Sequence, residues 1–134
     1  MRSFAIAMIA MMGLASSVAG AEQSYPDLKG TWTGIGAGAF VTALGFQTKA
    51  LPGDVEIKLV IDRQRGKHLA GTITSSQDAQ PFSGVIKSDG GILLSQTSGF
   101  VEARLIDADT METCYVRISA FSQMATCEEL KRQK

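Results

Sequence analysis

The sequence predicts an all-β fold, and three observations favour it. No long stretch shows the helical periodicity of apolar residues. Short runs in which apolar and polar residues alternate recur instead, separated by turn-forming residues. Two cysteines, Cys114 and Cys127, have a spacing that suits a bridge across one hairpin. Together these features indicate an antiparallel up-and-down barrel of about eight strands. A seven- or eight-stranded sandwich is the alternative, because alternation alone does not separate the two architectures.

The expected strands differ in how regularly they alternate. In residues 55–62 the side chains of Val55, Ile57, Leu59 and Ile61 share one face, so we expect them to point into the core. Turns such as Ser-Asp-Gly-Gly at 88–91 are typical of hairpins. The other expected strands are residues 30–38, 68–75, 82–87, 92–96, 100–106, 111–119 and 123–130.

The N-terminus predicts a secretory signal peptide over residues 1–21. Arg2 is the only charged residue before Glu22, and an apolar run follows it over 4–14. The run ends in small residues, and Ala19-Gly20-Ala21 has the form of a cleavage site. The run is short for a membrane span, so we expect no stable membrane anchor. The mature chain is then a single domain, residues 22–134, in the periplasm or secreted.

The charge of that domain gives little support to nucleic-acid binding. It holds twelve Lys and Arg against thirteen Asp and Glu, and basic residues gather only in the tail at 131–134. In an oxidising compartment the two cysteines predict one disulfide. We expect Cys114 to lie directly opposite Cys127 in a final hairpin. The same register pairs Val116 with Ala125 and places the turn at 120–121.

Residues 28–34, Leu-Lys-Gly-Thr-Trp-Thr-Gly, are the most informative motif. A glycine two residues before a tryptophan, at the start of the first strand, resembles the opening of the calycin barrels: lipocalins, avidins and some small periplasmic protease inhibitors. Ala-Gly-Thr-Ile at 70–73 is similar to an avidin strand. The resemblance implies that Gly30 lets the chain bend and that Trp32 plugs the barrel floor. It also implies that an arginine of a late strand packs on this ring, Arg117 first and Arg104 second.

The chain departs from the avidins in a way that bears on its ligand. Biotin sites in that family are walled by several tryptophans, and this chain has one. Biotin binding therefore receives no support. For another ligand, the aromatic residues that could wall a site are Phe40, Phe46, Phe82, Phe100 and Tyr115. The irregular segment 39–53 could cover the barrel mouth as a lid, but we favour ordinary packing for it.

Catalytic and metal-binding constellations are not evident. His68 is the only histidine, and it lies at a turn. Asp107 and Asp109 resemble a polar turn more than a calcium loop. The glycines of 34–38 lack the helix that a nucleotide-binding loop requires. We therefore expect no enzyme activity, no metal and no cofactor.

Two function classes remain open. The first is a binding protein for a small apolar or amphipathic ligand held in the barrel. The second is a protein-interaction module, such as a periplasmic protease inhibitor, that inserts the extended segment 22–27 into a partner.

Overall fold

The computed structural model describes residues 24–37, 40–43, 48–50, 54–75, 78–119 and 122–134. In this part of the chain all regular structure is β, with no helix and hence none that could cross a membrane. The strands are β1 (Gly30–Ala37), β2 (Phe40–Ala43), β3 (Thr48–Ala50), β4 (Asp54–Arg65), β5 (His68–Thr74), β6 (Ala79–Ile86), β7 (Ile92–Gln96), β8 (Gly99–Asp107), β9 (Thr110–Ile118) and β10 (Ser122–Arg132).

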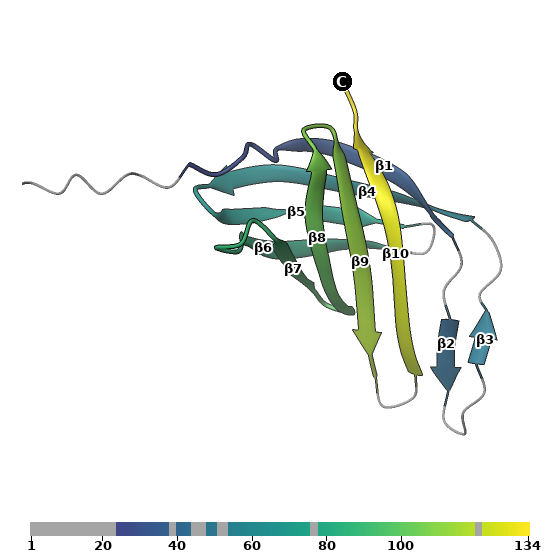
Figure 1. The fold of residues 1–134 in the computed structure, drawn as a ribbon. Coiled ribbons are helices and arrows are strands. Elements are labelled where there is room, and N and C mark those ends of the chain that lie inside the picture. Colours follow the sequence, from purple (N-terminus) through teal and green to yellow (C-terminus); the bar gives the residue numbers. More distant parts are fainter. Residues whose placement is uncertain (1–23, 38–39, 44–47, 51–53, 76–77, 120–121) are drawn as a thin grey trace, which may run out of the picture.

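Eight of the described strands form a closed antiparallel barrel (Figure 1). Strands β4 to β10 follow one another in chain order, and β1 pairs with both β4 and β10. Pairing between the first and last strands removes the sheet edges that an open sheet would expose. The predicted up-and-down barrel is confirmed, and the sandwich alternative is wrong.

Strands β2 and β3 form a hairpin within the segment that was expected to be a lid or ordinary packing. Strand β2 pairs with β10 over Ser122–Ala125, whereas β1 reaches β10 at Lys131 and Arg132. The hairpin therefore extends the sheet beyond the barrel, and Figure 1 shows it beside the far end of β10. Its side chains lie outside the described residues, so whether they pack or cover the mouth is not tested.

The barrel interior follows the predicted alternation. Val55, Ile57 and Leu59 line an internal cavity, and Ile61 lies below them in the buried core. Because successive strand residues point to opposite faces, the residues between them are directed to solvent. The buried hydrophobic residues are Leu28, Trp32, Leu59, Ile61, Leu69, Phe82, Ile86, Ile92, Leu94, Val101, Ala103, Met111 and Leu130.

Trp32 closes one end of the barrel, the floor, and is fully buried. Its indole Nε1 donates a hydrogen bond of 3.0 Å to the carbonyl of Leu28, which satisfies the polar atom of the ring. Gly30, two residues earlier, has a φ of 130°. Residues with a side chain rarely adopt this conformation, so the bend at the floor requires a glycine.

Arg132, and not Arg117 or Arg104, lies over the Trp32 ring, 4.3 Å from its centroid. The calycin resemblance implied Arg117 or Arg104 at this place, and that expectation was wrong because of the strand register. Trp32 is the partner of Arg132 across the β1–β10 seam. Arg117 lies near the opposite end of β9, and Arg104 is directed outward on β8 to pair with Glu112 at 2.6 Å.

The disulfide between Cys114 and Cys127 is confirmed, together with its predicted register. Cys114 is the direct cross-strand partner of Cys127, and Val116 is the partner of Ala125. The neighbours of Cys114, Thr113 and Tyr115, line the cavity. The bridge therefore lies on the outer face of the barrel, where it joins β9 to β10 without entering the interior.

Candidate functional site

A cavity of about 270 Å³ lies inside the barrel, at the end away from Trp32. Its lining comes from β1 and from each of β4 to β10, and it also includes Ser75, Asp78 and Ser98 between strands. The volume lies just below the range of about 300–1,000 Å³ for small-molecule sites. A molecule held in this space would therefore have to be small.

One part of the lining is apolar. Three residues of β4, one of β5 and one each of β7 and β8 contribute aliphatic side chains, and β10 adds two more. All occupy inward positions of their strands, which is why the predicted alternation placed several of them correctly. These residues are Val55, Ile57, Leu59, Ile73, Leu94, Val101, Met124 and Leu130.

A hydrogen-bonded polar group forms another part of the lining. The Ser98 hydroxyl lies 2.8 Å from the Tyr115 hydroxyl and donates to Gln80 Oε1 at 2.9 Å. The Ser98 amide donates to the same Gln80 oxygen, and Gln80 Nε2 donates to Asp78 at 2.7 Å. These contacts link the start of β6 to the β7–β8 turn and to β9. They fix the orientation of Tyr115 at the cavity wall.

Three other polar atoms of the lining are buried and have no partner within the described part of the protein: Gln96 Oε1, Arg117 Nε and Glu128 Oε2. Buried side-chain polar atoms in folded proteins are nearly always hydrogen-bonded. An unmade hydrogen bond of this kind costs about 1–3 kcal/mol, and more for a charged group. Their common position around one cavity therefore needs an explanation.

Glu128 is directed inward from β10. Thr113, its cross-strand partner on β9, donates from Oγ1 to Glu128 Oε1 at 3.2 Å. Burial raises the pKa of the Glu128 carboxyl above its ordinary value, against a smaller lowering by the Thr113 hydrogen bond. Across the seam, a Cβ built on Gly36 would lie 3.7 Å from Glu128 Oε2. The absence of a side chain at Gly36 thus leaves room beside this oxygen.

Arg117 is directed inward from β9, opposite Met124 of β10. A guanidinium keeps its charge at every pH relevant to proteins. Neither Arg117 nor Glu128 forms an ion pair with any residue that the structure describes. Among the described residues, the positive charge of Arg117 inside the barrel thus has no counterion within ion-pair distance.

The aromatic residues that were expected to line a ligand site lie in different places in the structure. Tyr115 lines the cavity. Phe82 is buried in the core but does not line the cavity, and Phe100 is directed outward with 38% of its surface exposed. Phe100 could not serve as a wall because its neighbour Val101 faces inward. Phe46 lies outside the described residues, and of Phe40 only the backbone in β2 is described.

Sequence reasoning missed the polar residues of the cavity, although a signal for some of them existed. On β10 the alternate residues Met124, Thr126, Glu128 and Leu130 share the inward face. A glutamate in phase with a buried leucine is an uncommon feature of a core face. For Gln96 the pattern gave no comparable signal, because it ends its strand.

The remaining chemistry-bearing residues do not gather into a second site. Within the described ranges, no group of three or more His, Cys, Asp or Glu residues could hold a metal ion. His68 is exposed at the start of β5. Asp107 accepts a hydrogen bond from the Asp109 amide at 2.8 Å, the arrangement of a polar turn.

Comparisons with known proteins show a likeness of architecture. No protein-family model matches the sequence, and neither does any curated protein. Among solved structures, the chain is similar to the S-type phycobiliprotein lyase CPES from Guillardia theta, with a TM-score of 0.47 and 10% sequence identity. The match covers 80% of this chain and 89% of that chain. A likeness at this level concerns the course of the backbone and says nothing about ligand or activity.

Proposed function

We propose that this protein is a non-catalytic binding protein that holds a small amphipathic molecule inside its barrel. One observation carries the proposal: a cavity of about 270 Å³ whose lining includes three buried polar atoms without a partner in the described part of the protein. Small-molecule sites combine a mostly apolar lining with a few converging polar groups. The lining of this cavity has both components.

The energetic argument supports a ligand over a purely structural interior. Protein cores pack as densely as organic crystals, and apolar side chains could have filled a barrel of this size. A cavity that retains a glutamate and an arginine instead makes the fold less stable. Departures from good packing and polar satisfaction are expected at functional sites.

The arrangement offers little for catalysis. Of the hydroxyls in the cavity, that of Ser98 contacts Tyr115 and Gln80, and neither is an effective base near neutral pH. We therefore propose binding and not turnover. We also propose that the protein is exported, since the Cys114–Cys127 disulfide is typical of oxidising compartments.

The alternative of a protease inhibitor with a free N-terminal arm is less well supported. Arg132 donates to the carbonyl of Asp27 at 2.8 Å, and Gln64 donates to the carbonyl of Pro26 at 2.8 Å. Tyr25 is partly buried against the core. The described part of the arm is thus fastened to the barrel, whereas insertion into a partner would require it to be free.

The proposal is tested by titrating the purified protein with N-phenylnaphthylamine, whose fluorescence rises in apolar surroundings. Val101 lines the cavity, so we expect V101F to fill it and to weaken binding about tenfold or more. The matched control is I118F, which adds the same ring at an outward position that is 71% exposed and should not change binding. Circular dichroism verifies that both variants fold. Absence of binding to the unmodified protein, or equal binding to folded V101F, would contradict the proposal.

A further inference from the structure

We propose that the ligand has two polar ends: an anionic group, such as a carboxylate, that meets Arg117, and a neutral hydroxyl or amide that meets Glu128, with an apolar body between them. This inference rests on the proposed function and specifies the chemistry of its ligand. It is carried by the relative position of Arg117 and Glu128 and by one buried atom of each, Arg117 Nε and Glu128 Oε2, that has no partner in the described part of the protein.

The spacing of the two residues follows from the β9–β10 register. Arg117 lies opposite Met124, and Glu128 lies opposite Thr113. We call the Arg117–Met124 pair the upper level of the cavity and the Thr113–Glu128 pair, nearer the floor, the lower level. Met124 and Glu128 are four residues apart on β10, so the two levels are separated by about 13 Å along the strand. No ion pair joins Arg117 and Glu128 in the described structure, and one ligand could contact both.

At the upper level, the positive charge of Arg117 favours an anionic group on the ligand. A guanidinium is positively charged in proteins, and the Arg117 Nε is buried without a partner in the described part of the chain. The other carboxylate of the lining, Asp78, already accepts a hydrogen bond from Gln80. An arginine binds a carboxylate through two parallel hydrogen bonds, which makes this anion class the best match in geometry.

Gln96 supports the same assignment. Its strand partner is Gly99, and the next residue of β8, Phe100, is the partner of Val116. Gly99 therefore falls beside the position of Arg117, so that Gln96 and Arg117 flank a residue without a side chain. The Gln96 amide can turn to present its NH₂ group, which would donate to the same anion.

The lower level suits a neutral group. Burial favours the protonated form of Glu128, and Thr113 already donates to Oε1. The other oxygen, Oε2, has room beside Gly36. A protonated carboxyl can donate one hydrogen bond and accept another, which a hydroxyl or amide can complement. A second anion at this level would be repelled as Glu128 ionises.

The experiment measures displacement of bound N-phenylnaphthylamine by three compounds of one chain length: decanoate, omega-hydroxydecanoate and decanol. We expect omega-hydroxydecanoate to bind more tightly than decanoate. We expect decanol to bind at least about tenfold more weakly than decanoate, since it lacks the charge-assisted hydrogen bonds to Arg117. The R117M variant should lose the preference for decanoate over decanol, whereas R117K should keep part of it.

The lower level is tested with E128L, which should lose the advantage of omega-hydroxydecanoate over decanoate. Matched controls are R63M and E56Q on β4, because both residues are exposed to solvent. Each control should leave all three affinities unchanged, and thermal unfolding verifies that every variant folds.

The two proposals fail in different ways. Equal binding of decanoate and decanol, or an unchanged preference in folded R117M, would overturn the two-ended ligand while leaving the cavity as a binding site. An unchanged hydroxyl advantage in folded E128L would overturn the role of Glu128. Absence of probe binding to the unmodified protein would overturn both proposals.

Discussion

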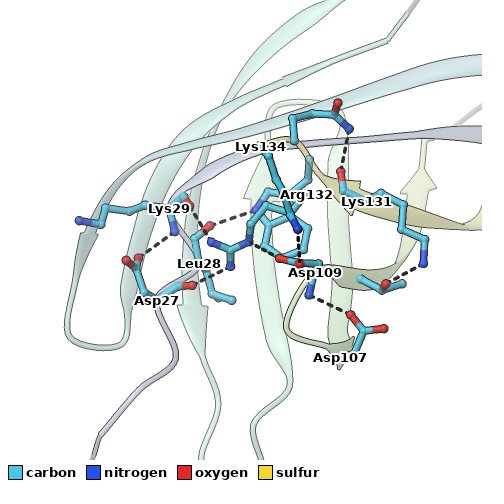
Figure 2. Close-up of polar contacts among 11 residues, drawn as sticks. Asp27, Leu28, Lys29, Asp107, Asp109, Lys131, Arg132 and Lys134 are labelled. Atoms are coloured by element: carbon cyan, nitrogen blue, oxygen red, sulfur yellow. Dashed lines mark hydrogen bonds and ion pairs between the residues drawn. The ribbon is translucent and has the colours of Figure 1, made fainter.

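The guanidinium of Arg132 lies over the indole ring of Trp32 and joins the last strand of the barrel to the first. The same side chain donates from Nη2 to the carbonyl of Asp27 at 2.8 Å and from Nη1 to the carbonyl of Lys29 at 3.2 Å. Figure 2 shows the guanidinium between this segment and Asp109 of the β8–β9 turn, whose carboxylate lies 3.7 Å from Nε. One side chain therefore holds three parts of the floor together.

We predict that R132M lowers the free energy of unfolding by about 2–4 kcal/mol, since it removes the stacking on Trp32 and two charge-assisted hydrogen bonds. The measurement is urea denaturation followed by circular dichroism. The R117M variant is the matched comparison, and we expect it to be neutral or stabilising because Arg117 has no described counterion. Equal losses in the two variants would contradict this distinction between the floor and cavity arginines.

We predict that replacing both cysteines, C114A with C127A, lowers the free energy of unfolding by about 3 kcal/mol, the chain-entropy value for a loop of this length. The two cysteines are 13 residues apart in the sequence. Since the bridge lies on the outer face, binding of N-phenylnaphthylamine should persist in the folded double variant. Denaturation of the intact protein with and without reductant gives an independent value. A folded double variant that no longer binds the probe would show that the bridge shapes the cavity.

The strand order, the closing hairpin and its disulfide could be predicted because each depends on local spacing. The register of Cys114 and Cys127 follows from two positions and one turn, and the inward face of β4 follows from period-two alternation. The arginine on Trp32 could not be chosen in the same way. That choice depends on how the first and last strands meet, which is a property of barrel closure and leaves no trace in local sequence.

The cavity was only partly predictable for a related reason. Aromatic residues were expected to line it, yet Phe100 faces outward, and among the described lining residues Tyr115 is the aromatic one beside aliphatic and polar side chains. The informative residues were polar ones in phase with the core, such as Glu128 beside Leu130.

We predict that an alanine is tolerated at one glycine of β1 and destabilises the fold at another. A Cβ at Gly34 would meet the carbonyl oxygen of Glu129 and would lie 2.8 Å from Leu130 Cδ2. G34A should therefore lower the free energy of unfolding by about 1–3 kcal/mol through strain at the β1–β10 seam. At Gly36 the nearest atom would be 3.6 Å away, so G36A should be tolerated. Thermal unfolding of the two variants measures the difference, and equal melting temperatures would contradict the close approach at Gly34.

We predict that E128Q changes the pH dependence of stability in a defined direction. Burial raises the folded-state pKa of Glu128 above the ordinary value of 4.5, so the folded protein holds this proton more tightly than the unfolded chain does. The contribution of Glu128 is therefore fully present below pH 4.5 and is lost as the pH rises through the folded-state pKa. Relative to the unmodified protein, E128Q should gain stability over that interval.

The matched control for this prediction is E112Q on the outer face. Arg104 lowers the pKa of Glu112 through a hydrogen bond and its charge, so the contribution of Glu112 is present above pH 4.5 and is lost as the pH falls. The difference between E112Q and the unmodified protein should thus change with pH in the opposite sense. The other titratable groups of the cavity lining, Asp78, Tyr115 and Arg117, remain in both variants and cancel in the comparison. Urea denaturation between pH 3 and 8 measures both slopes, and parallel slopes for the two variants would contradict the assignment of a buried, proton-retaining carboxyl to Glu128.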